Sequence, residues 1–263
     1  MRISRIFLYD EPAVPQINLE NLVTFLKRTF RVSVIRKESI FAHADRETAR
    51  QLAAARVFNY RTPFEMHTPT DEEIKIEMQS FSNSASNDGI VLYDGFEFQK
   101  IIAGLVPEKE STIDNLHVVF TNKLTCTFDY NDYRYHGRAL ICANPSIIST
   151  TGIVEAPAKP KDYYIDMMKN YTQGLNVDSV KEKYHGQYLD YADERLETIV
   201  EGYCMQAIFY HITGEPFCDL LNCRLHNAHW QRDLLYSQIE FGKICSKHED
   251  ILRRWTALND LNC

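Results

Sequence analysis

The chain has 263 residues, of which 44% are apolar and 12% aromatic, enough to fill the core of one large domain or two small ones. Its formal net charge of −7 argues against nucleic acid and anionic membranes as partners, because both recruit clustered Lys and Arg. No apolar stretch is long enough to span a bilayer or to form the core of a signal peptide, so the sequence predicts a cytoplasmic protein.

The first part of the chain predicts strands and helices in alternation. An apolar strand at 3–9, an amphipathic helix at 19–29 and a strand at 32–35 form a βαβ-type opening, which requires the two strands to run parallel. Further helices are expected at 46–58, 71–81 and 96–105, and further strands at 89–93, 116–120, 125–130 and 138–142. Thr70 and Glu73 match a capping box, and the polar segment 129–137, which contains His136, is expected to be a hairpin loop.

From residue 156 onward the sequence is mostly helical, with helices expected at 161–171, 180–191, 195–213, 229–242 and 246–258. The helix at 195–213 has the clearest repeat of apolar residues, and Gly214 followed by Pro216 ends it. The expected fold class is therefore α/β (α+β), with a sheet subdomain at 1–155 and a helical subdomain at 156–263 that together form one compact unit.

Cysteine and histidine gather near the C-terminus, where three of the seven cysteines and four of the nine histidines lie between His211 and His248. Cys218 and Cys223 are separated by four residues, and Cys245 and His248 by two. Three thiolates and one imidazole can close a tetrahedron around zinc and leave no position for a reactive water, so this pattern predicts one structural zinc per chain. The alternative is that the cysteines are core thiols and His248 is a solvated helix residue.

The other cysteines, namely Cys126, Cys142, Cys204 and Cys263, are interpreted as small buried hydrophobic residues. A nucleophilic Cys126 or Cys204 beside a histidine is an alternative that no spacing supports.

His211 lies on the apolar stripe of the helix at 195–213. A helical zinc-peptidase site needs a second histidine one turn earlier with a glutamate beside it, so that two imidazoles and a general base share a face. Those two positions hold Ala207 and Ile208, which can neither bind zinc nor accept a proton.

The segment HITGEPFCDLLNCRL at 211–225 resembles the archaemetzincins, which are zinc peptidases of the metzincin type with the pattern HExxHxxGxxHC, four residues, CxM and a later CxxC. In this register His211 matches the second zinc histidine, and the predicted structural zinc ligands match a second zinc site, with His248 in place of its last cysteine. The resemblance implies a metzincin-like mixed sheet with the zinc helix behind it. The segments GEPFC, CRL and NAHWQ are also similar to uncharacterised archaeal proteins described as metallopeptidases.

The chain departs from this pattern at the catalytic positions. Ala207 replaces the first histidine, Ile208 the glutamate, Phe217 the third histidine and Leu225 the methionine under the metal. One histidine does not hold zinc or lower the pKa of a bound water, so the resemblance implies the fold and the structural zinc rather than standard peptidase activity.

Two functions follow as hypotheses. In the first, a degenerate metzincin-like protein keeps its structural zinc and serves as a binding or scaffolding module for an unknown protein or peptide partner. In the second, an active metallopeptidase uses a non-standard metal site made from His211 with His226 or His229 and an acid such as Glu215 or Glu201. For His226 and His229, helix capping or packing is the other interpretation.

Overall fold

The computed structural model describes residues 3–82 and 90–260 and has a mixed α/β architecture with two sheets. The larger sheet has the strand order β2-β1-β4-β8-β7 and consists of β1 (Arg5–Tyr9), β2 (Ser33–Lys37), β4 (Asn115–Thr121), β7 (Leu140–Ile141) and β8 (Ser146–Ser149). The smaller sheet has the order β3-β5-β6 and consists of β3 (Leu92–Asp94), β5 (Leu124–Asp129) and β6 (Arg134–Arg138). The expected α/β (α+β) class is confirmed.

The βαβ opening is also confirmed, because β1 pairs in parallel with β2 and with β4. β8 joins β4 in parallel, and the short edge strand β7 runs antiparallel to β8. In the smaller sheet β3 and β5 are parallel, whereas β5 and β6 form an antiparallel hairpin.

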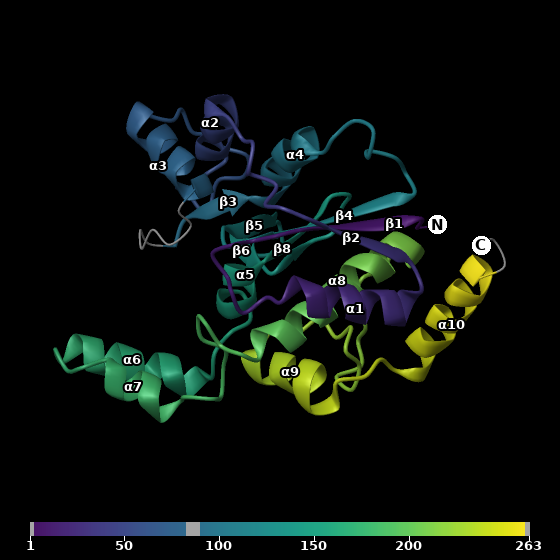
Figure 1. Cartoon of the computed structure of the whole chain (residues 1–263). Helices are drawn as coiled ribbons and strands as arrows, with labels where there is room; N and C mark the ends of the chain where they lie inside the picture. Colours follow the sequence, from purple (N-terminus) through teal and green to yellow (C-terminus); the bar gives the residue numbers. More distant parts are fainter. Residues whose placement is uncertain (1–2, 83–89, 261–263) are drawn as a thin grey trace.

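Helices cover both faces of the larger sheet (Figure 1). On one face lie α2 (Arg46–Ala54), α3 (Asp71–Ser82) and α4 (Gly95–Leu105), and on the other lie α1 (Leu19–Phe30) and α8 (Leu196–Thr213). The remaining helices are α5 (Thr150–Glu155), α6 (Lys161–Thr172), α7 (Asp178–Lys183), α9 (Gln231–Leu235), the π-helix Tyr236–Phe241 and α10 (Ser246–Asp260). No helix in the described part of the chain is both long enough and apolar enough to cross a membrane.

The side-chain alternation of β1 supplies two hydrophobic cores. Phe7 and Tyr9 belong to the core beneath α2 and α4, whereas Ile6 and Leu8 belong to the larger core that contains α1 and α8. α8 is apolar around most of its circumference, which is the pattern of a helix enclosed by the rest of the protein. It is therefore the central element of the larger core.

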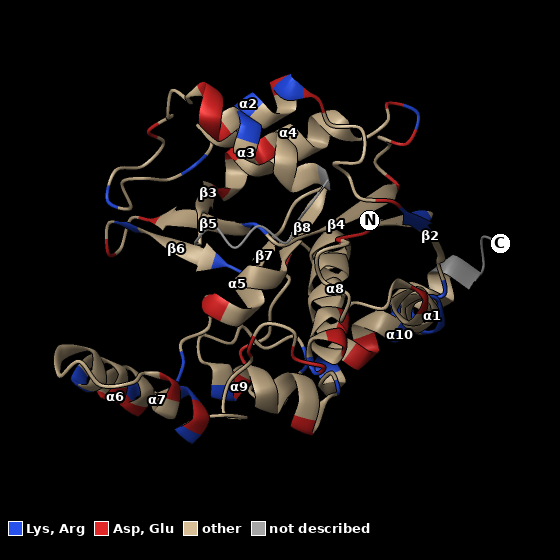
Figure 2. Cartoon of the chain, turned by 60° about the vertical axis from the view of Figure 1, so that its left-hand side comes forward, with Lys and Arg blue, Asp and Glu red and all other residues tan. Residues whose placement is uncertain are grey.

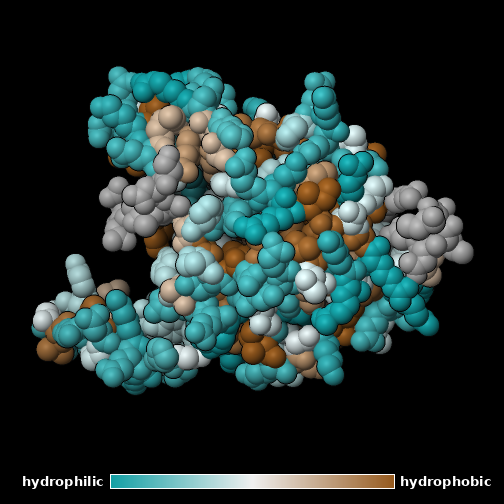
Figure 3. Space-filling view, viewed as in Figure 1, coloured by the Kyte–Doolittle hydropathy of each residue, from teal (hydrophilic) through white to brown (hydrophobic). Residues whose placement is uncertain are grey.

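α6 and α7 form a helical hairpin that projects from the body (Figure 1). Its own small core consists of Tyr163, Val180, Tyr184 and Tyr188. The hairpin exposes apolar residues, among them Met168, which is 65% exposed, and Leu175, which is 54% exposed. Brown atoms mark the end of this hairpin in Figure 3.

The structure corrects several expected elements. The segment 129–137 is not all loop, because β6 begins at Arg134 and places His136 within a strand. The strand expected at 138–142 is divided between the end of β6 and β7, and β8 and α5 were not predicted. The helix expected at 180–191 ends at Lys183, and that expected at 229–242 becomes α9 followed by the π-helix. Gly89, the first residue of the expected strand 89–93, lies outside the described residues.

Candidate metal centre

The loop after α8 carries two of the predicted ligands. α8 ends at Gly214, whose φ of 82° is easily adopted by glycine, and the Gly214 N–H donates to the Tyr210 carbonyl. The Cys218 N–H donates to the Leu225 carbonyl at 2.8 Å, which brings the two ends of this loop side by side. Cys218 and Cys223 therefore lie on one small closed loop.

Arg224 fastens this loop to two helices. Its Nη2 lies 2.9 Å from Glu201 Oε2 on α8, and its carbonyl accepts a hydrogen bond of 2.8 Å from Gln238 Nε2 on the π-helix. The arginine side chain is 8% exposed and that of Glu201 22%, so the ion pair is partly shielded from water. Glu201, a candidate acid in the sequence, is thus engaged in holding the loop.

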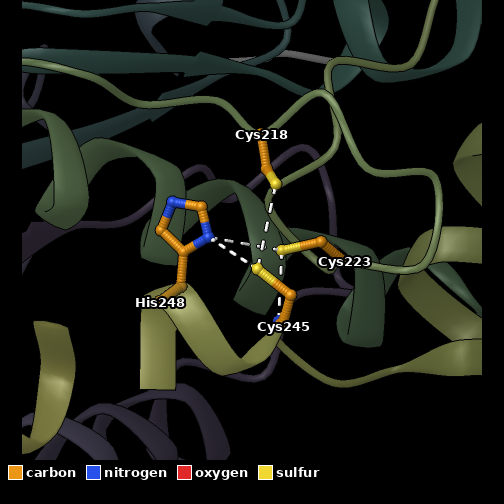
Figure 4. A group of neighbouring side chains, drawn as sticks. All are labelled: Cys218, Cys223, Cys245 and His248. Carbon is orange, nitrogen blue, oxygen red and sulfur yellow. Dashed lines mark hydrogen bonds between the residues drawn. The ribbon is translucent and has the colours of Figure 1, made fainter. Parts of the chain in front are cut away.

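The beginning of α10 carries the other two predicted ligands. The His248 N–H donates to the Cys245 carbonyl at 2.9 Å, so both side chains leave the same turn. The His248 ring packs edge-on against Phe209 of α8, with 5.4 Å between ring centroids. This contact holds the imidazole with its Nδ1 toward the cysteines (Figure 4).

The four side chains converge (Figure 4), and their ligand atoms all lie within 4.8 Å of one another. The Sγ atoms of Cys218 and Cys245 are 3.9 Å apart, and His248 Nδ1 lies 3.7 Å from Cys223 Sγ and 3.1 Å from Cys245 Sγ. Tetrahedral zinc with ordinary bond lengths would give edges of about 3.8 Å between two sulfurs and about 3.5 Å between sulfur and nitrogen. The donor set therefore fits zinc.

The protein environment shifts the pKa values of two ligand thiols in opposite directions. Burial raises the pKa of the Cys223 thiol to about 12, while the Cys245 N–H donates to its Sγ at 3.4 Å. The pKa of Cys245 is lowered: burial opposes this, but hydrogen bonds from the His248 backbone and neighbouring groups outweigh it. Metal binding would release the remaining thiol protons, since zinc binds the thiolate form.

His211 lies apart from the other candidate histidines. Its Nε2 is buried and has no hydrogen-bond partner among residues 3–82 and 90–260. Burial lowers the pKa of His211, while a hydrogen bond with the backbone of Ile113 acts in the opposite direction. One turn earlier, Ala207 and Ile208 are completely buried in the larger core.

His226 and His229 both line a cavity of about 460 Å³ beside α8, which His211 does not line. His226 Nδ1 lies 3.2 Å from the Cys218 carbonyl, and the His229 carbonyl accepts from the Ala158 N–H. Within residues 3–82 and 90–260, His211, His226 and His229 form no group of three ligand atoms close enough to share a metal. Glu215 is exposed on the loop surface.

Of the four cysteines interpreted as small buried residues, Cys126 and Cys204 have the expected surroundings. Cys126 and Cys204 are completely buried, Cys142 is partly buried, and Cys263 lies outside the described residues. Burial raises the pKa of the Cys126 thiol to about 12, and it also raises the pKa of the Cys204 thiol. Both therefore remain protonated thiols at neutral pH, which makes them poor nucleophiles.

A second group with metal-binding side chains was missed in the sequence. Asp129, Asp132 and His136 lie together on the β5–β6 hairpin, and His136 Nε2 is 2.8 Å from an Asp132 oxygen. Arg134 also pairs with Asp132 at 2.7 Å, so a cation already neutralises this exposed carboxylate. The two aspartates and the histidine were visible in the sequence, but their convergence depends on β6 being a strand.

Together these features define a mixed α/β protein with a buried site of three cysteines and one histidine that can bind a metal, packed against its central helix. Comparison with protein-family models places the chain more specifically. Residues 2–255 match the model described as "Probable metallopeptidase family (DUF6775)", and the chain belongs to this family. Comparisons with curated proteins and with solved structures gave no match.

Proposed function

We propose that this protein is a relative of the archaemetzincins that binds one structural zinc and uses the cavity beside α8 to bind a peptide, without hydrolysing it by the standard zinc mechanism. The four predicted ligands would hold the zinc, namely Cys218, Cys223, Cys245 and His248. The zinc would join the loop after α8 to the start of α10.

The observation that carries the proposal is the completeness of this ligand set. Four protein donors within 4.8 Å of one another fill a tetrahedron and leave no site for a water molecule to be activated. The six described cysteines are all free, which suits thiolate ligands in the reducing cytoplasm expected from the sequence.

The residues at the catalytic positions of the archaemetzincin pattern support a role without standard hydrolysis. Ala207 and Ile208 have apolar side chains enclosed by the core, Leu225 is also fully buried, and Phe217 lines the cavity beside α8. None of these side chains can bind zinc or act as a general base. The same cavity, at about 460 Å³, has the size of a ligand pocket.

Elemental analysis of the purified chain tests the zinc assignment. We expect one zinc per chain in the wild type, in His211→Ala and in Cys142→Ser, which serves as a matched control because Cys142 is a thiol outside the cluster. Cys218→Ser and Cys223→Ser should each lose the zinc. Absence of metal from the wild type would overturn the assignment.

The alternative, an active peptidase with a non-standard metal site, is favoured by one observation: His226 and His229 line the same cavity. It predicts a second metal that is lost in His211→Ala, His226→Ala or His229→Ala, and hydrolysis of a quenched fluorescent peptide library that stops when this metal is lost. Binding of such peptides without turnover, at one metal per chain, would support the proposed peptide-binding role instead.

A further inference from the structure

The cavity beside α8 is unusual in its charge. Among the residues that the structure describes, the lining includes no Asp or Glu and a single Lys or Arg, which is Arg138, although the chain as a whole has a net charge of −7. The apolar part of the wall includes Leu140 and Ile141 of β7 and Phe217. An apolar pocket with one cationic group is suited to an apolar ligand that carries a negative charge.

Arg138 is held in position but keeps hydrogen-bonding capacity. It is the last residue of β6, which ends beside α5 (Figure 2). Its Nε donates to Thr127 Oγ1 at 2.7 Å, which fixes the plane of the guanidinium. Among the residues that the structure describes, its two Nη groups have no carboxylate partner and no hydrogen bond. Two parallel N–H donors of this kind match the two oxygens of a carboxylate.

Gln206 lines the same cavity and has a buried side-chain acceptor. Its side chain is 1% exposed, and its Nε2 donates to the His226 carbonyl at 3.2 Å, which orients the amide. Its Oε1 is buried and has no hydrogen-bond partner within the described residues. A buried acceptor without a partner costs free energy, and an N–H group from a bound ligand would remove that cost.

We propose that this cavity binds a peptide through a carboxylate, with Arg138 as the partner of the carboxylate and Gln206 Oε1 as the acceptor for a peptide N–H. This inference rests on the proposed peptide-binding function and specifies its ligand. The carboxylate is either the C-terminus of the peptide or the side chain of Asp or Glu, because both present the same pair of oxygens. Apolar side chains of the peptide would occupy the wall formed by β7 and Phe217.

Fluorescence polarisation with three sets of labelled hexapeptides tests the inference. All three sets contain apolar residues and carry the dye at the N-terminus; the first ends in a free carboxylate, the second in an amide, and the third in an amide with one internal glutamate. We expect the first or the third set to bind the wild type at least tenfold more tightly than the second. Whichever of them binds more tightly identifies the source of the carboxylate.

Variants locate the interaction. Arg138→Met should lower the affinity for the carboxylate peptides about tenfold or more and leave that for the plain amides unchanged, while Arg138→Lys should recover part of the loss. Arg134→Met is the matched control, because Arg134 lies on the same strand but is exposed and pairs with Asp132. Thermal unfolding shows whether each variant folds. If Arg138→Met does not fold, the affinity of Arg138→Lys for the carboxylate peptides decides whether the inference holds.

Two results would overturn the inference in distinguishable ways. If all three peptide sets bind equally well, or if Arg138→Met and Arg138→Lys bind carboxylate peptides as the wild type does, the carboxylate assignment is wrong but peptide binding stands. If none of the three peptide sets binds, both the carboxylate inference and the proposed peptide-binding function are wrong.

Discussion

Glutamine in place of Glu77 should destabilise the protein strongly while leaving its shape almost unchanged. The Glu77 side chain is 1% exposed. Its Oε1 accepts from Arg56 Nη2 at 2.7 Å and from the Tyr93 hydroxyl at 2.6 Å, and its Oε2 lies 2.8 Å from Lys123 Nζ. One carboxylate therefore forms ion pairs with two cations, Arg56 and Lys123, whose side chains are about nine-tenths buried.

The magnitude follows from leaving these cations without their shared partner. Removing one member of a buried ion pair typically costs about 3 to 5 kcal/mol. Arg56 keeps a weaker partner in Glu73 at 3.9 Å, so we expect the lower end, about 3 kcal/mol. For a protein of this size, that loss corresponds to a decrease in Tm of roughly 6 to 12 °C.

The pH dependence gives a second readout of the same group. The pKa of Glu77 is lowered: burial opposes ionisation, but the charge and hydrogen bond of Lys123 outweigh it, with help from Tyr93 and Arg56. A carboxyl group whose pKa is lower in the folded state stabilises the fold above its unfolded pKa of about 4.5, and this contribution is lost as the pH falls through the folded pKa. The stability difference between wild type and Glu77→Gln should therefore shrink below about pH 4.5.

Urea unfolding at constant ionic strength measures both effects. Glu72→Gln is the control, since Glu72 lies on the same helix with its side chain 75% exposed and should change stability by less than about 0.5 kcal/mol. A loss below about 1 kcal/mol for Glu77→Gln at neutral pH would refute the argument that this carboxylate holds two buried cations.

Three further predictions concern a helix cap, a close contact and the metal. Hydrogen bonds, chiefly from the Thr70 N–H, lower the pKa of Glu73 to about 2. The stabilising effect of the Glu73 carboxylate is therefore complete above about pH 4.5 and is lost toward about pH 2. In urea unfolding, the stabilities of the wild type and Glu73→Gln should converge as the pH falls over this range. Gly202→Ala should lower the free energy of unfolding by about 1 to 3 kcal/mol, because a Cβ there would collide with the side chain of Gln238. Thermal or urea unfolding measures this loss, and an unchanged stability would mean that the Gln238 side chain moves away freely. Removing the metal with a chelator should lower the Tm and loosen α10, as seen by hydrogen exchange, whereas an unchanged Tm after verified metal loss would show that the site does not stabilise the fold.

Local signals in the sequence predicted much of the fold. The capping box appears as expected, with the Thr70 N–H donating to Glu73 Oε2 at 2.7 Å and the Glu73 N–H donating to Thr70 Oγ1 at 3.3 Å. The continuous apolar run of β1 and the helical repeat of apolar residues in α1 also gave correct elements, because β1 is buried on both faces and α1 on one.

Elements that depend on distant partners were missed. β6 is polar, and it becomes a strand because β5 pairs with it from Thr125 to Asp129. The π-helix is set by tertiary contacts such as that of Gln238 with the Arg224 carbonyl, which no local pattern encodes.

The candidate site likewise contains residues that the sequence predicted and residues that it could not predict. Spacing alone suggested the four cysteine and histidine ligands, whose convergence the structure now describes. The cavity residues Arg138 and Gln206 could not be predicted, because β6 and α8 are far apart in sequence and only the fold brings them to one cavity.

The projecting α6–α7 hairpin should unfold locally more often than the rest of the molecule. Its four-residue core is separate from the two cores that enclose the larger sheet, and an ion pair between Lys183 and Asp166 at 2.6 Å lies at its surface. Such a unit can unfold and refold many times while the rest of the protein stays native. Its backbone amides should therefore exchange with solvent far sooner than those of β1 and β4, and a protease should cut first at its turn near Gly174, leaving a large resistant fragment on either side.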